Sequence, residues 1–179
     1  AALATVMYRA NLLIVLLAVS SVLCGQAPVY SAAAIVNSAN WEAGNLAPYT
    51  FATIFGEHLA DETRVRTEAD SNIPGLGAVS VWVNGVEAMV FYISPEQVNF
   101  LVPIMWQSGT VKVRLTNRGI FGPVVFLELR EYAPALFQLD ANLVVAQRWP
   151  EYAVVTPDSP ARPGDIVILY VTGLGSFKE

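Results

Sequence analysis

The sequence has one histidine, one cysteine and few charged residues, which make up 14% of its 179 residues. A nucleophile activated by a base needs that base, and a single histidine leaves little choice, so the composition argues against enzymes of this kind. The ten Lys and Arg residues do not cluster and the net charge is −5, which gives no electrostatic basis for nucleic-acid binding. No segment after residue 30 has a sustained helical period, so the sequence does not favour a helical fold.

The N-terminal segment has the three-part pattern of a secretory signal. Met7-Tyr8-Arg9 supplies a positive charge, residues 12–23 are apolar apart from two serines, and the small-residue segment Gly25-Gln26-Ala27 follows. The apolar stretch is shorter than the roughly 20 residues that span a bilayer. We therefore predict a signal peptide region over residues 1–27 and no membrane span in the mature chain. A buried helix and a permanent membrane anchor are the alternatives.

Cys24 leaves two forms of export open. The stretch Ser21-Val22-Leu23-Cys24 is similar to a lipoprotein signal, but the bulky Leu23 stands where such a signal has a small residue. We expect ordinary secretion, with lipid anchoring through Cys24 as the alternative, and an extracytoplasmic location in either case. A mature chain without cysteine forms no disulfides, so its fold depends on packing.

Short strand patterns separated by turn residues fill the rest of the chain. Strands are expected at 50–55, 97–102, 110–116 and 124–129, with a polar surface excursion or edge strand at 61–72. Asn84-Gly85 lies between two alternating runs and predicts a hairpin with a type I′ turn. The pattern predicts an all-β, immunoglobulin-like β-sandwich over residues 28–140.

An internal repeat extends this organisation. Residues 48–60, PYTFATIFGEHLA, align without a gap on residues 163–175, PGDIVILYVTGLG, at an offset of 115. We therefore expect a linker or strand-containing connection at 141–162. We expect residues 163–179 to begin a second β module that is truncated, so that the strand Ile166–Val171 has no partner and the chain is a fragment.

The motifs YISPEQVNFLVP (92–103), VNGVEA (83–88), APALF (133–137) and RPGDIVILYVTGLG (162–175) resemble a known family. It is the C-terminal domain family of secreted acidobacterial, Solibacter-type proteins, which is similar to immunoglobulin-like IPT/TIG modules. The resemblance covers roughly residues 34–179 and implies secretion and a β-sandwich. It implies no catalytic residue and no cofactor.

One part of the family motif has a physical interpretation of its own. Ser94-Pro95 ends a strand, because proline fixes φ and donates no hydrogen bond. Gln97 and Asn99 alternate with apolar residues, so their amides share one face. We expect these amides to tie the 94–96 turn and a neighbouring loop to the sheet, with ligand contact as the alternative.

Reactive groups are sparse. His58 is expected on an exposed turn, and Glu57, Asp61 and Glu62 share one polar loop, so a small hydrolase is the least favoured function. The segment 68–72 offers oxygen ligands but lacks the spacing of a calcium loop. We predict no metal site and no cofactor.

Four tryptophans, at positions 41, 82, 106 and 149, are the remaining lead to a function. Exposed tryptophans stack on ligands or anchor partners, although aromatic residues more often fill a core. Trp106, after Pro103, is the first candidate contact residue and Trp82 the second. We expect a non-catalytic secreted module with a structural, adhesive or binding role, its partner a polysaccharide or a cell-envelope protein. The alternative is an accessory carbohydrate-binding module of a larger secreted enzyme.

Overall fold

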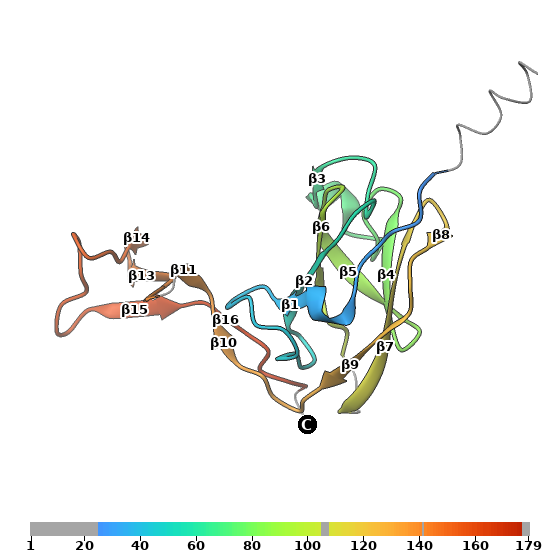
Figure 1. Ribbon diagram of the computed structural model, residues 1–179. Coiled ribbons are helices and arrows are strands. Elements are labelled where there is room, and N and C mark those ends of the chain that lie inside the picture. Colours follow the sequence, from blue (N-terminus) through green and yellow to red (C-terminus); the bar gives the residue numbers. More distant parts are fainter. Residues whose placement is uncertain (1–24, 105–107, 141, 177–179) are drawn as a thin grey trace, which may run out of the picture.

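The computed structural model describes residues 25–104, 108–140 and 142–176, and the regular secondary structure there is almost entirely β (Figure 1). No helix within these ranges is long and apolar enough to cross a membrane. The regular elements are η1 (Ala32–Ala34), β1 (Ile35–Asn37), β2 (Phe51–Phe55), β3 (Arg64–Val65), η2 (Glu68–Asp70), β4 (Val79–Val83), β5 (Val86–Ile93), β6 (Gln97–Leu101), β7 (Gly109–Asn117), β8 (Ile120–Phe121), β9 (Val125–Leu129), β10 (Ala135–Leu136), β11 (Gln138–Asp140), β12 (Leu143–Val144), β13 (Ala146–Trp149), β14 (Ala153–Val154), β15 (Ile166–Leu169) and β16 (Val171–Thr172).

The first nine strands form one antiparallel sheet that curls into two layers, with β5 in both. The first half of β5 pairs with β4, which continues to β7, β8 and β9. The second half pairs with β3 and β6, and β6 continues to β2 and β1. The register of β5 shifts between Val90 and Tyr92, an irregularity of the kind that bends a strand. The result is the all-β sandwich that the sequence predicts.

Alternation along the strands builds the core. On β4, Val79, Val81 and Val83 are buried while Trp82 points outward. The same period places Val98 and Phe100 of β6 inside. Side chains from both layers meet in one cluster, whose larger members are Tyr30, Ile35, Leu46, Ile54, Leu59, Leu76, Ile93, Phe100, Leu115, Leu127 and Leu129.

The turn between β4 and β5 has the conformation that its sequence requires. Asn84 and Gly85 have φ of 47° and 83°, and a type I′ turn needs positive φ at both central residues. The backbone N–H of Asn84 donates to the Lys112 carbonyl, and the Asn84 Oδ1 accepts from the Lys112 N–H, both at 2.8 Å. The turn is therefore also attached to β7.

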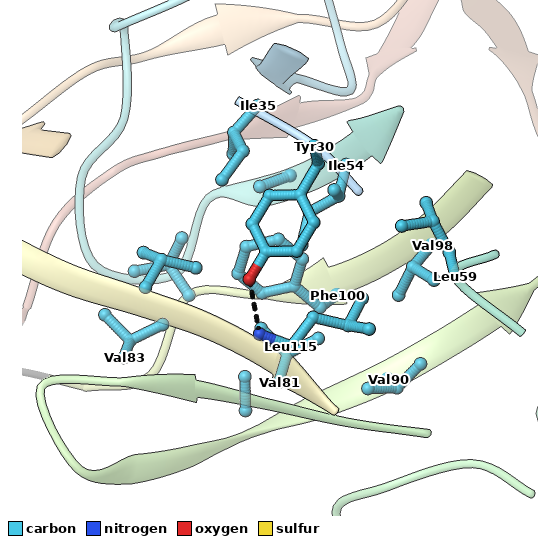
Figure 2. Packing of buried hydrophobic residues seen from close by; sticks show 14 of the residues in the cluster. Tyr30, Ile35, Ile54, Leu59, Val81, Val83, Val90, Val98, Phe100 and Leu115 are labelled. Atoms are coloured by element: carbon cyan, nitrogen blue, oxygen red, sulfur yellow. Dashed lines mark hydrogen bonds between the residues drawn. The ribbon is translucent and has the colours of Figure 1, made fainter. Parts of the chain in front are cut away.

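Tyr30 fixes the N-terminal segment to the interior of the sandwich (Figure 2). Its hydroxyl accepts a hydrogen bond from the backbone N–H of Leu115 and donates one to the carbonyl of Pro123, both at 2.7 Å. Leu115 is fully buried, so the hydroxyl satisfies a backbone group that water does not reach. Burial is the main reason that the pKa of Tyr30 is raised above its usual value of about 10.

Arg66 organises the polar excursion between β2 and β4. Its guanidinium donates to five backbone carbonyls at 2.5–2.9 Å, those of Val90, Asp70, Ile73, Pro74 and Gly75. It also lies 5.8 Å from the centre of the Phe91 ring. One cation thus holds most of the 64–75 segment against β5.

The second part of the chain forms an arm, residues 138–170, that projects to one side of the sandwich (Figure 1). Its three-stranded sheet has the order β14-β13-β15. The expectation that Ile166–Val171 lacks a partner is wrong, because β15 pairs with all four residues of β13 and Val171 pairs with Leu136. The reason is that the 141–162 connection supplies a strand of its own.

The arm repeats the pairing of the first strands in the sandwich. In β1 and β2, Ile35 lies opposite Ile54, and in β13 and β15, Ala146 lies opposite Leu169. Leu169 follows Ile54 by 115 residues, which is the offset of the sequence repeat, and Ala146 follows Ile35 by 111. The next two residue pairs of each ladder show the same two offsets, 111 between β1 and β13 and 115 between β2 and β15. The two strand pairs therefore have the same register.

The hairpin before these strands is repeated as well. In the sandwich, Val36 forms a β-bridge with Ala43, and in the arm, Gln147 pairs with Val154. Gln147 and Val154 follow Val36 and Ala43, respectively, by 111 residues. Within each hairpin an aromatic residue has a left-handed backbone, with φ of 61° at Trp41 and 56° at Tyr152. Few non-glycine residues adopt such φ values, so the two hairpins share a specific backbone path.

The chain returns from the arm to the sandwich through a close contact. The Thr172 hydroxyl donates to the Tyr49 carbonyl at 3.0 Å and accepts from the Phe51 N–H at 2.7 Å. The backbone N–H of Ala133 donates to the Gly173 carbonyl at 2.9 Å. Gly173 has φ of 75°, and a Cβ atom there would lie 2.2 Å from the Ala133 carbonyl oxygen, so this position requires glycine.

Replacing Tyr30 with phenylalanine should lower the free energy of unfolding by about 1–3 kcal/mol, because the buried Leu115 N–H loses its partner. The raised pKa of Tyr30 gives a further signature. The Tyr30 hydroxyl stabilises the fold fully below pH 10, its pKa in the unfolded chain, and this stabilisation is lost as the pH rises through the higher pKa of the folded state. Denaturant unfolding at neutral and alkaline pH measures both effects. Tyr132→Phe, which removes an exposed hydroxyl, is the control, and an equal loss in the two variants would contradict the assignment.

Arg66→Lys should destabilise the protein by about 2 kcal/mol, since an ammonium group cannot reach the carbonyls that the guanidinium fork spans. Amide hydrogen exchange should accelerate first in residues 64–75. Arg130→Lys, at an exposed position after β9, is the matched control. Unchanged exchange in 64–75 would show that the segment is held by other contacts.

Candidate functional site

The outer surface of the β4–β7 layer carries the candidate site, which we call the aromatic face and define as Trp82, Lys112, Arg114, Phe121 and Phe126. Trp82 on β4 lies directly opposite Arg114 on β7. Strand β9 pairs with the edge of β7 that faces away from β4, and there Phe126 lies directly opposite Lys112. Because directly opposed residues in an antiparallel pair point to the same side, these side chains share the outer surface.

Arg114 and Phe121 form the centre of this face. The guanidinium carbon of Arg114 lies 3.9 Å from the centre of the Phe121 ring, and its Nε donates to the Gly122 carbonyl at 3.2 Å. Phe121 is 55% exposed, Phe126 57% and Trp82 37%. The cation is held in place by a ring and a carbonyl, so its orientation is fixed before any partner arrives.

The arrangement is suited to binding. Flat aromatic surfaces stack on the apolar faces of sugar rings or anchor protein side chains, and the neighbouring cations donate hydrogen bonds. Single exposed apolar residues need no explanation, but three aromatic rings on one sheet face are a patch. The fold maintains this patch without using it for its core.

The sequence-predicted tryptophans are placed differently from one another. Trp82 lies on the outer surface of the sheet. Trp106, the first candidate, lies outside the described residues. Trp41 is 54% exposed with its ring 6.0 Å from that of Phe55, and Trp149 is 48% exposed in the arm beside Tyr152. The structure therefore brings neither Trp41 nor Trp149 to the aromatic face.

The residues of the SPEQVNF motif form an internal polar network. The Ser94 hydroxyl accepts from the Gln97 N–H at 3.0 Å, which closes the 94–96 turn. The Asn99 Oδ1 accepts from Gln97 Nε2 at 2.8 Å and from the Thr53 hydroxyl at 3.1 Å. A further hydroxyl contact joins Thr53 to Ser38 at 2.7 Å. The amide side chains thus connect β6 to β2, whereas we expected them to reach the turn itself.

Of the candidate acid–base residues, Asp61 is held in contacts with its neighbours. His58 lies on a turn with φ of 58°, but it is half-buried rather than exposed. Asp61 forms an ion pair with Arg118 and accepts from Asn117 Nδ2. Asp61, Glu62, Asn117 and Arg118 line a cavity of about 340 Å³, and His58 is not part of its lining. The Asn117 Oδ1 is buried and has no hydrogen-bond partner among the described residues.

The segment 68–72 is built around Asp70, whose carboxylate faces its own loop. It accepts from the Thr67 N–H and hydroxyl, both at 3.0 Å, and forms an ion pair with Arg64. The hydrogen bond from the Thr67 backbone is the largest cause that lowers the pKa of Asp70. Nowhere in the described ranges do three His, Cys, Asp or Glu side chains gather as metal ligands would.

Sequence reasoning named Trp82 as a contact residue and missed the other four members of the aromatic face, the cations Lys112 and Arg114 and the rings Phe121 and Phe126. A signal existed for Phe126, because it alternates with Val125 and Leu127 in VVFLEL and so points away from the core. Phe121 lies in a two-residue strand next to a turn, and nothing local predicts its side.

Comparison with known proteins gives no assignment. No protein-family model matches the chain, and no curated protein matches its sequence.

Asp70→Asn should remove part of the acid sensitivity of folding. A lowered folded-state pKa means that the Asp70 carboxylate stabilises the fold above its unfolded pKa of about 4 and loses that effect as the pH falls through the lower value. Unfolding midpoints from pH 7 to pH 2 should therefore change less in the variant. Asp158→Asn, at an exposed position in the arm, should leave the profile unchanged. An unchanged profile in Asp70→Asn would contradict the assigned role.

Proposed function

We propose that the chain is a non-catalytic secreted β-sandwich module that binds a partner through its aromatic face, with a structural or adhesive role at the cell envelope or outside the cell. The observation that carries the proposal is the stacked Arg114–Phe121 pair on the sheet face that also carries Trp82 and Phe126, a set of rings that the core does not use. The leader-like pattern of residues 7–27 and the resemblance to secreted Solibacter-type domains support the location.

A second candidate function is an accessory carbohydrate-binding module of a larger secreted enzyme. The observation that favours it is the placement of three rings along neighbouring strands of one sheet, because a sugar chain lying across the strands can stack on successive rings. Lys112 and Arg114 beside the rings add hydrogen-bond donors for hydroxyl or acidic groups.

Trp82→Ala should weaken retention of the protein on its partner by about tenfold or more, as expected when an aromatic anchor is removed from a binding surface. The measurement is a pull-down with cell-envelope fractions and a panel of insoluble polysaccharides. Envelope fractions treated with protease separate the two candidates, because a sugar partner survives the treatment and a protein partner does not.

Trp41→Ala removes a tryptophan that is also exposed but lies away from the aromatic face, so it should bind as the unmodified protein does. Circular dichroism establishes that each variant is folded. The proposal fails if no fraction retains the unmodified protein, or if Trp41→Ala and Trp82→Ala reduce binding equally.

A further inference from the structure

Strand β15 is an exposed sheet edge. It pairs with β13 on one side, and within the described residues no strand pairs with its other side. Val167 is 38% exposed and Leu169 52% exposed. An unpaired edge displays a row of backbone N–H and C=O groups that are ready to pair with another chain.

The repeat shows what such an edge accommodates. In the sandwich, the residues equivalent to Val167 and Leu169 are Ala52 and Ile54 of β2, and both are fully buried. Strand β6 pairs antiparallel along that edge of β2. The same backbone path in the arm therefore has an edge that fits an antiparallel strand.

The repeat also indicates which backbone groups point to the open edge of β15. The Phe51 carbonyl accepts from Ser38 on the β1 side, whereas the Gly56 N–H donates to Glu96 on the β6 side. Because backbone direction alternates along a strand, the groups of Ala52 and Ile54 also face β6. By equivalence, the N–H and C=O groups of Val167 and Leu169 face the open edge.

Nothing in the sequence of β15 protects this edge. Its residues, Ile166 to Leu169, include no charge, no proline and no glycine, and its pairing with β13 has no bulge. Natural edge strands are usually short or carry lysine, proline or a bulge, and the sandwich edges β3 and β8 have only two residues each. An unprotected edge of this kind pairs readily with a second strand.

We propose that the open edge of β15 is a self-association surface, on which β15 of a second copy pairs antiparallel about a two-fold axis. Val167 of one copy then lies opposite Leu169 of the other, so the groups that face the edge satisfy each other. Ile168 lies opposite its own counterpart, and Asp165 lies opposite Val171, so like charges do not meet. A two-fold contact closes at two copies and does not extend into a filament.

The area involved sets the strength of the contact. Four side chains per copy flank the edge, those of Ile166, Val167, Leu169 and Tyr170, and each is 38–64% exposed. Partial burial of these side chains removes on the order of 500 Å² from water over both copies. A stable specific interface needs about 1,000 Å². The pairing is therefore a weak and reversible one that increases with protein concentration.

Disulfide trapping tests the geometry directly. Opposed residues in a non-hydrogen-bonded pair have Cα atoms about 4.5 Å apart, within the range that a disulfide spans. Ile168→Cys in a Cys24→Ser background should form a covalent dimer under mild oxidation that reductant reverses. Val65→Cys in the same background places a thiol on an equally open strand, β3, and should give far less dimer at the same concentration.

Sedimentation equilibrium of the full chain gives the independent test. The unmodified protein should show an average mass that rises toward that of a dimer with concentration, and Leu169→Lys should abolish the rise. Val65→Lys should not. The proposal is overturned if the unmodified chain stays monomeric up to about millimolar concentration, if Leu169→Lys associates equally, or if Ile168→Cys and Val65→Cys cross-link equally. A monomer whose Val167 and Leu169 amides resist hydrogen exchange would show that the chain itself covers the edge.

Discussion

The structure depends on one constraint, which is that each backbone N–H and C=O removed from water must find a partner. Where the sandwich cannot supply a neighbouring strand, a side chain does so: the Tyr30 hydroxyl serves the Leu115 N–H, and Arg66 serves five carbonyls of the polar excursion. Side chains therefore complete a sheet that strands alone leave open. In the arm, the same requirement is met on one side of β15 by β13, and no described element meets it on the other.

Packing determines the residues of the core but not those of the outer surface of the sandwich. Burial of valine, leucine and phenylalanine on the inner face accounts for the fold, and it leaves the outward positions of β4, β7 and β9 unconstrained by packing. Those positions hold tryptophan, arginine and phenylalanine, with the arginine fixed against one ring. This surface is one that the fold does not require yet keeps ordered, and it is the surface on which we propose that a partner binds.

Much of the fold follows from local sequence. Alternating apolar residues predict β4, β6, β7 and β9, and the Asn84-Gly85 pair predicts the turn of the first hairpin, because these signals depend only on strand period and turn conformation. The pairing of β13 with β15 was missed, since AQRW carries no alternating apolar pattern and its partner lies across a long connection. Of the aromatic face, the sequence indicated Trp82. It did not indicate Phe121, whose side is decided by pairing with β7.

The hydrogen bonds of Thr172 and Gly173 determine how the arm is attached to the sandwich. The chain passes from the sandwich to the arm and back again, and both passages are bonded to the sandwich: the Gln138 N–H donates to the Ala39 carbonyl, and the Thr172 hydroxyl donates to the Tyr49 carbonyl. The arm is therefore attached to the sandwich at two points instead of one. If one molecule bound the aromatic face and another bound β15, the two attachments would restrict how far these molecules could move relative to each other.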